Sequence, residues 1–298
     1  MSSIFSHLIR VSLVSSFTTQ RTSFYQPSSS SSSTSSGKHD HYQHGIPGIP
    51  SDGKVVLLKN SSTGAQVYLV GTIHYYKEST QIVKKVINYV KPDTIAVELC
   101  ESRAKQLLEL RSVDDNLYTL YLGSKRARGG LSTKVGMFVR NLLHLWRGEI
   151  LAPNCEFWVA MEEASRVGAG CFFIDQDEDV TDEQLFNLVR SSESICQSHK
   201  RVIKADRKKK EEDYTRSPYQ ELNSYWKDVS PETFKVIVED RDKHMFMELR
   251  RFQGKIVAVV GIGHMDGIEL LWERAENGED WQPPANQKCG LAMCTMLV

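Results

Sequence analysis

Two histidines carry the clearest chemistry in this sequence, because each follows an apolar, β-branched run in the same way. Residues 67–74 read VYLVGTIH and residues 256–264 read IVAVVGIGH, so a Gly-x-x-His pattern closes each run. Such a run predicts a buried strand, with the glycine at a tight exit from it. Ligand sites in open α/β sheets form in the crevice at the carboxyl ends of the strands. We therefore expect His74 and His264 to meet there.

Acidic residues follow two further apolar runs. Residues 94–100 predict a strand that carries Glu98, and the next run is closed by Asp175 and Asp177. A buried carboxylate costs several kcal/mol unless it is paired or bound to a metal ion. Glu98 therefore either faces solvent at the end of its strand or points into the same crevice as the first histidine.

Two imidazoles and one or two carboxylates suit a divalent metal ion such as Mn, Co, Fe or Zn. Open positions on such an ion could hold and activate water for hydrolysis. The sequence thus predicts His74, His264 and Glu98 as metal ligands, with Glu98 as a ligand or a general base. Arg103 lies a few residues further on and could pair with Glu98 or hold an anionic group.

The second histidine segment also allows a different interpretation. Residues 261–267 read GIGHMDG, follow a strand and open a helix, which resembles a loosened dinucleotide fingerprint. They lie too near the C-terminus to be followed by a strand with the ribose-binding acid. The chain also lacks a complete Gly-x-x-x-x-Gly-Lys-Ser/Thr phosphate loop, because Val55 follows the match at residues 48–54. Nucleotide binding is therefore the weaker interpretation.

The elements that must position these residues alternate between strand and helix patterns. Residues 54–58 and 66–70 predict a hairpin, and Ser79 is a candidate N-cap for a helix that ends near residue 90. The next strand then completes a βαβ unit, which favours parallel pairing. Further helices are predicted over residues 102–122, 131–146, 157–167, 181–195, 230–252 and 265–275. The expected fold is α/β, with a mostly parallel or mixed central sheet, flanking helices and a helical insertion.

Composition limits the remaining choices. The chain has 298 residues, no net charge and 40% hydrophobic residues, enough for one sizeable core with a helical elaboration. A balanced charge gives no argument for nucleic acid as a partner. Six cysteines without a Cys-x-x-Cys pair indicate free thiols in a reducing compartment. No apolar run approaches the roughly 20 residues that span a bilayer.

The first 44 residues are predicted to be a disordered targeting segment and linker. They are basic, serine-rich and poor in acids, which is typical of an organelle transit peptide, with the mitochondrion ahead of the plastid. A plain disordered tail on a cytoplasmic protein is the alternative. The predicted divisions are a folded domain over residues 45–278, with a helical elaboration over about 102–167 and a charged segment over about 198–216, and a C-terminal tail over 279–298.

Two surfaces are candidates for contacts with partners. The apolar stripe of residues 131–146 could lie on a membrane surface as a peripheral contact, although a helix packed on the core is the more ordinary interpretation. The charged residues 200–213 read by default as a solvated helix or loop. The sequence does not define an oligomeric state.

The ordered set of motifs resembles the TraB (pheromone-shutdown, TraB/PrgY) domain family. Residues 69–74, 91–93 and 97–103 carry the first part of the resemblance. Glu156 stands where the family has a Gly-Glu-Met-like turn. The later parts are residues 173–177, 239–245 and 260–268, so the resemblance covers about residues 55–272. One departure is Gln176, where the family usually has arginine.

The resemblance implies a wider superfamily that includes the Tiki proteins and erythromycin-esterase-like enzymes. Tiki-like members are described as metal-dependent proteases that use two Gly-x-x-His motifs and a glutamate. Carried over, the matching positions are His74, His264, Glu98 and Arg103. Three acids would orient these groups through hydrogen bonds without binding the metal ion themselves, namely Asp175, Asp177 and Glu156.

The resemblance also implies a place in the cell. Eukaryotic members of the family are associated with mitochondria, some as contact-site or dynamics factors. We therefore expect a metal-dependent, peptidase-like hydrolase in the mitochondrial matrix or at the outer surface. The departure at Gln176 keeps an alternative open, a non-catalytic regulator that uses the same fold to bind a peptide or protein partner.

Overall fold

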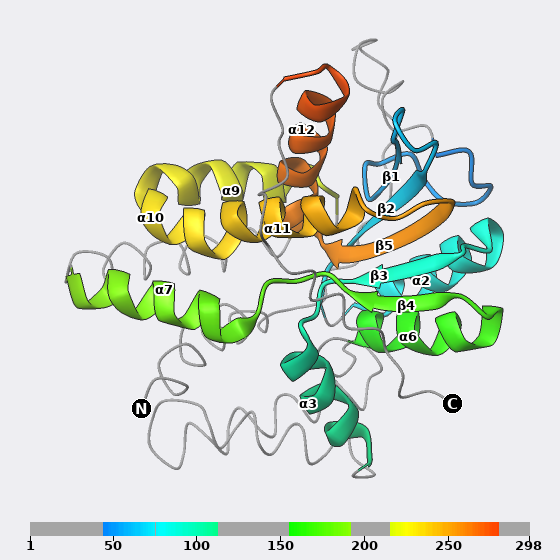
Figure 1. The fold of residues 1–298 in the computed structure, drawn as a ribbon, viewed down its shortest axis with the longest axis horizontal. Helices are drawn as coiled ribbons and strands as arrows, with labels where there is room; N and C mark the ends of the chain where they lie inside the picture. The colour runs from blue at the N-terminus through cyan, green and yellow to red at the C-terminus, as the bar shows by residue number, and fades with distance from the viewer. Residues whose placement is uncertain (1–43, 75, 113–154, 192–214, 280–298) are drawn as a thin grey trace, which may run out of the picture.

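The computed structural model describes residues 44–74, 76–112, 155–191 and 215–279, which build a five-stranded mixed sheet (Figure 1). The strands are β1 (Val55–Lys59), β2 (Gln66–Thr72), β3 (Thr94–Val97), β4 (Gly170–Phe173) and β5 (Lys255–Gly261). Their order in the sheet is β1-β2-β5-β3-β4. β1 pairs antiparallel with β2, and the other neighbours pair in parallel. The predicted α/β fold with a mixed, mostly parallel sheet is confirmed.

Helices cover both faces of the sheet. The longer described helices are α2 (Lys77–Val90), α3 (Glu101–Ser112), α6 (Cys155–Val167), α7 (Glu178–Ser191), α9 (Ser217–Val229), α11 (Asp240–Leu249) and α12 (Met265–Glu276). Side chains of β5 alternate between two cores, as the period of two in a strand requires. Val257 and Val259 pack with α2 and α6, whereas Ala258 and Val260 pack with α11 and α12. The sheet is therefore the middle of three layers.

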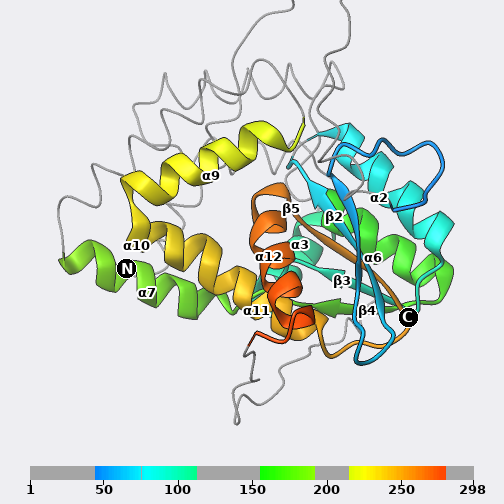
Figure 2. The same ribbon diagram turned by 90° about the horizontal axis from the view of Figure 1, so that it is seen from above.

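A separate group of helices extends to one side of the sheet. α7, α9 and the short α10 (Pro231–Phe234) lie away from the strands in both views (Figures 1 and 2). Trp226, Phe234 and Val238 form a small apolar cluster of their own there, apart from the two main cores. Helix α9 follows directly on the charged segment and was not predicted.

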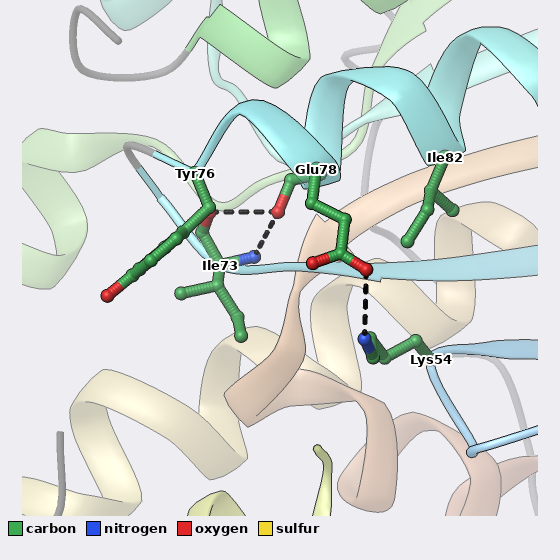
Figure 3. A pocket seen from close by; sticks show the side chains of 6 residues that line it. Lys54, Ile73, Tyr76, Glu78 and Ile82 are labelled. Atoms are coloured by element: carbon green, nitrogen blue, oxygen red, sulfur yellow. Dashed lines mark hydrogen bonds and ion pairs between the residues drawn. The ribbon is translucent and has the colours of Figure 1, made fainter. Parts of the chain in front are cut away.

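The start of α2 differs from the prediction in a way that affects the site. Ser79 is not the N-cap, because the helix already begins at Lys77 and has no side-chain cap. Instead the Ser79 hydroxyl accepts a hydrogen bond from Ile73 N (3.0 Å) and donates one to Ile73 O (2.9 Å). Figure 3 shows Ile73 beside this first turn of the helix. The hydroxyl thus ties the residue before His74 to the helix that follows.

The strands that begin at Gln66 and Thr94 are parallel, as predicted, and β5 lies between them. One further prediction needs correction, and several concern residues that the structure does not describe. The helix predicted over 230–252 is interrupted by a π-helix, η2 (Lys235–Glu239), between α10 and α11. The targeting segment, the 131–146 stripe, most of the helical elaboration, the 200–213 segment and nearly all of the C-terminal tail lie outside the described residues. Among the described helices, none has the length and apolar character to cross a bilayer.

Candidate functional site

Polar side chains converge at the carboxyl ends of the four parallel strands. His74 follows β2, Glu98 follows β3, Asp175 follows β4 and His264 follows β5. Because these strands run in parallel, their carboxyl ends lie along one edge of the sheet. Glu98 is only 3% exposed, so the solvent-facing interpretation is wrong. The two histidines therefore lie at the same edge of the sheet, as the two Gly-x-x-His patterns predicted.

Glu98 is the centre of this cluster. Its Oε2 accepts a hydrogen bond from the backbone N–H of Gly261 (2.5 Å), and its Oε1 accepts one from Arg241 Nη2. His264 Nε2 lies 3.3 Å from the same Oε1. Burial alone would raise the pKa of Glu98, but His264 and Arg241 together hold this pKa well below its usual range. The cluster therefore favours the charged, carboxylate form of Glu98.

His264 is held on both sides by carboxylates. Its Nδ1 donates to Oδ1 of buried Asp242 at 2.6 Å, which leaves Nε2 directed at Glu98. Burial would lower the pKa of His264, but Glu98 and Asp242 outweigh burial and raise this pKa to about 9. Burial raises the pKa of Asp242 to about 6, against the attraction of His264.

His74, like His264, has its Nδ1 bound by a carboxylate that comes from a helix. Its Nδ1 donates to buried Glu156, the first-turn acid of α6. Burial would lower the pKa of His74, and Glu156 reverses this effect so that the pKa is raised. The side chain remains 27% exposed. A methyl group on Gly261 would lie 3.7 Å from His74 Nε2 and 3.2 Å from Glu98 Oε2, so both groups lie close to this glycine.

Two arginines of the cluster, Arg241 and Arg103, both bind Asp175. Arg241 binds Asp175 with both ends of its fork, Nε to Oδ1 and Nη2 to Oδ2, each at 2.8 Å. Arg103 donates to Asp175 Oδ2 at 2.6 Å and keeps 21% of its side chain exposed. Burial would raise the pKa of Asp175, but Arg241 and Arg103 lower it. Arg103 and His74 are thus the members of this cluster that solvent reaches best.

The glycines of the two Gly-x-x-His patterns allow neighbouring side chains to come close, and they do not form a turn. Gly71 lies within β2 and Gly261 is the last residue of β5. A methyl group on Gly71 would come within 3.0 Å of Met265 Cγ at the start of α12. A methyl group on Gly261 would press on Glu98. The predicted role as a tight strand exit is wrong, and both glycines instead leave room for a neighbouring side chain.

Arg241 and Asp242 complete the site but were not identified as site residues from the sequence. A signal was present for Asp242, because it lies on the helical stripe formed by Met245, Phe246 and Leu249. A carboxylate at a core position of a helix needs a buried partner. That partner is His264. Room for the carboxylate comes from Gly267, where a methyl group would approach Asp242 Cγ to 2.7 Å.

Asp177 does not join the cluster. It is exposed, and its carboxylate accepts a hydrogen bond from Asp179 N (3.0 Å) at the beginning of α7. Gln176, at the position where arginine was expected, donates to Thr181 Oγ1 at 3.2 Å. Of the three acids predicted to lie behind the ligands, the structure therefore brings Asp175 and Glu156 to the site.

The charge of the cluster suits a cation at the imidazoles. Four buried carboxylates (Glu98, Glu156, Asp175 and Asp242) face two guanidinium groups, so the site has an excess of negative charge whenever both histidines are neutral. Each imidazole has its Nδ1 fixed by a carboxylate, the arrangement that presents Nε2 to a metal ion. The donor chemistry thus fits a divalent ion on the two Nε2 atoms.

Glu98 fits less well as a third ligand. Both of its oxygens already accept hydrogen bonds, from Arg241 and from Gly261 N–H. Within the described residues, no group of three or more histidine, cysteine, aspartate or glutamate side chains is arranged to hold a metal ion. The same buried carboxylate on Gly261 N–H argues against the nucleotide interpretation, because it would repel a phosphate.

Comparisons with known proteins agree with this arrangement. The model of the TraB/PrgY/gumN family matches residues 56–125. The chain is 28% identical over 243 residues to an uncharacterized protein of Methanocaldococcus jannaschii, a match that covers 76% of this chain and 58% of that protein. It is 27% identical over 258 residues to a human TraB domain-containing protein, covering 76% of this chain and 67% of the relative. A bovine TraB domain-containing protein is 27% identical over 241 residues, covering 70% and 63%.

The fold and the site define an α/β protein with a histidine–carboxylate cluster at the carboxyl ends of its parallel strands. The family match covers β1 to α3, which supply His74, Glu98 and Arg103. Over this part, the chain is similar to the TraB/PrgY/gumN family, and its relatives include TraB domain-containing proteins.

Proposed function

We propose that this chain is a metal-dependent hydrolase that acts on peptide bonds. The observation that carries the proposal is the pair of imidazoles on adjacent parallel strands. Each has its Nδ1 bound by a buried carboxylate, His264 Nε2 lies 3.3 Å from Glu98 Oε1, and His74 Nε2 lies close to Gly261 beside the same carboxylate. His74 and His264 would hold the ion through these Nε2 atoms. When bound, a divalent ion such as Mn, Co, Fe or Zn makes water a nucleophile near neutral pH.

Glu98 would orient the attacking water. Its strongly lowered pKa makes Glu98 a weak general base, since a general base works best with a pKa near the working pH. As a carboxylate it accepts a hydrogen bond well and fixes the direction of its donor. Arg241 and the Gly261 N–H hold the carboxylate still for this role.

Arg103 would bind the substrate oxygen on which negative charge develops. Asp175 orients its guanidinium through one Nη atom, while part of the side chain faces solvent beside His74. A guanidinium placed in advance at such an oxygen stabilises the transition state without reorganisation. A peptide carbonyl presents an oxygen of this kind.

A peptide-library assay of the full chain tests the proposal. The chain is supplied with Mn, Co, Fe or Zn in turn, and cleavage is followed by mass spectrometry. We expect cleavage with at least one metal, and a loss of about 100-fold or more in Glu98→Gln and Arg103→Met, as for other preorganised groups. Lys235→Ala, an exposed change, is the matched control. Cleavage that persists in both site variants, or none with any metal, would leave the chain as a binding protein for peptides or proteins.

We also propose that the chain works in or on mitochondria. The basic, acid-poor and serine-rich first 44 residues support this address. A fluorescent fusion of residues 1–44 tests it directly. We expect mitochondrial fluorescence, and a diffuse cytosolic signal would refute the address.

A further inference from the structure

Helix α9 contacts the loop that carries His264 through polar side chains. Asn223 Nδ2 donates to the backbone carbonyl of Gly263 at 2.7 Å. Gln220 Nε2 donates to Asp266 Oδ1 at 2.8 Å, and Arg216, just before the helix, binds the same carboxylate. These three residues are spaced four and three apart, so they lie along one face of the helix. The whole face is turned to the segment between β5 and α12.

The position of the Asn223 bond makes it relevant to the site. Residues Ile262–His264 form a single 3-10 turn, η3, between the strand and α12. Gly263 precedes His264 directly, so the orientation of its peptide plane sets the direction in which the imidazole leaves the backbone. At the other end of the side chain, Asp242 binds the ring. His264 is therefore fixed at its base by α9 and at its ring by α11.

Helix α9 has little apolar packing of its own. Among its described residues, Trp226 is the buried one, and it belongs to the small cluster with Phe234 and Val238. The partly buried Tyr219 is the residue of α9 that packs against a main core. Tyr225 on the same helix is exposed. Segments with few buried apolar contacts open at a lower free energy than the core of a domain. The polar face of α9 therefore contributes much of what holds the helix in place.

We propose that α9 is a positioning helix for the site. While docked, it holds the 262–266 loop so that His264 Nε2 faces Glu98. When its polar contacts are lost, the loop moves and the second histidine leaves its place. The docking itself follows from the contacts above, and only its effect on metal binding rests on the proposed function.

Asn223 is the residue to change, because its side chain is uncharged and its hydrogen bond goes to a backbone carbonyl next to His264. Asn223→Ala removes the donor, and Asn223→Asp keeps the shape while replacing the donor by an acceptor. Ser224→Ala, one position along and exposed, is the matched control. Each variant is made in the full chain.

Hydrogen exchange by mass spectrometry tests the docking in the metal-free protein. We expect the amides of residues 262–266 to exchange about fivefold faster in Asn223→Ala, the scale of one lost intramolecular hydrogen bond. We expect a larger increase in Asn223→Asp and none in Ser224→Ala. β5 should exchange as in the wild type. Unchanged exchange in the loop would overturn the proposal, and so would an equal increase throughout β5, because that reports general destabilisation.

Cobalt affinity is the second readout. We expect both Asn223 variants to bind Co²⁺ about fivefold more weakly or worse, with Ser224→Ala unchanged. Co²⁺ affinity equal to the wild type in a variant whose loop exchanges faster would overturn the positioning role. If the wild type binds no Co²⁺, the proposed function fails, and the exchange result alone decides whether α9 holds the loop.

Discussion

Arg241 joins the two carboxylates that lie behind the histidines, Glu98 and Asp175, and almost no water reaches the three side chains. Its remaining Nη1 donates to the carbonyl of Ile237 at 3.2 Å. Both carboxylates have lowered pKa values because of this guanidinium, despite their burial. Each charge is thus tolerated in the interior because the others are present.

Removal of Arg241 should therefore be costly. We expect Arg241→Gln to lower the free energy of unfolding by about 3–5 kcal/mol, since it leaves two buried carboxylates with too little positive charge. Urea denaturation measures the change. The control is Lys235→Ala, which breaks an exposed pair with Asp240 and should cost less than about 1 kcal/mol. Equal effects of the two substitutions would contradict the view that the buried network holds the site.

His264 gives the metal-free protein a pH dependence of known sign. The folded chain holds the His264 proton with a pKa of about 9, against about 6.5 for an unfolded chain. Its contribution to stability is therefore complete below pH 6.5 and is lost as the pH rises through 9. We expect the free energy of unfolding to fall by up to about 3 kcal/mol over this range. Urea titrations at several pH values, with EDTA present, measure it. An equally steep fall in His264→Gln would assign the effect to another group.

At this scale, the members that follow strands were identified from the sequence, as were Arg103 and Glu156 on helices, whereas Arg241 and Asp242 of α11 were missed. His74, Glu98, Asp175 and His264 each close an apolar run, so their meeting could be predicted from the rule for parallel strands. The partners of the imidazoles depend on which helix packs over the strand ends. Periodicity along the chain does not contain that information.

Among the elements, the π-helix η2 explains how one helix supplies two adjacent site residues. Residues Lys235–Glu239 adopt the wider turn immediately before Arg241 and Asp242. A π-turn inside an α-helix disturbs the regular hydrogen-bond ladder and is frequent at functional sites. The Ile237 carbonyl in this turn accepts the hydrogen bond from Arg241. The irregular segment thus provides an acceptor for the side chain that it positions.

Helix α12 contains a glycine that should not tolerate alanine. In an open helix, Gly→Ala stabilises by up to about 1 kcal/mol. At Gly267 the new methyl group would instead collide with Asp242, which is buried and bound to His264. We expect Gly267→Ala to destabilise the chain by about 1–3 kcal/mol, as overpacking does. Thermal unfolding measures the change, with Leu270→Ala on the exposed side of α12 as the control. A stabilising Gly267→Ala would show that Asp242 does not occupy this position.

The strands and the helices that cover the sheet could be predicted, because their buried faces leave a clear period in the sequence. α2 and α12 were expected within two residues of their observed ends. Helix α9 was missed because a single buried tryptophan leaves almost no apolar pattern. The π-turn was missed because its sequence, KVIVE, favours a regular helix as much as an irregular one.

At the scale of the whole molecule, the three layers and the side group of helices differ in how they are held. The sheet packs between two large apolar cores, whereas α9 and α10 share a cluster of three buried residues. The site lies where these two parts meet, since β5 supplies His264 and α9 contacts its loop.

This difference in packing predicts that the side group of helices opens locally more often than the sheet does. We expect amides in β2, β3 and β5 to exchange at rates set by global unfolding, and those in α7, α9 and α10 to exchange at least about 10-fold faster through local opening. Native-state hydrogen exchange on the full chain measures both rates. Uniform protection in both parts would contradict the division.

The central claim is that His74 and His264 hold one divalent metal ion. Elemental analysis tests it most directly, on the full chain after reconstitution with Mn, Co, Fe and Zn in turn. The wild type is compared with His74→Ala, His264→Ala and the exposed control Ser224→Ala. We predict about one ion per chain in the wild type and the control, and none in either histidine variant, because two imidazole ligands act together in one site. Absence of metal from the wild type, or an equal content in all four proteins, would contradict the claim and leave the histidines as hydrogen-bonded structural groups.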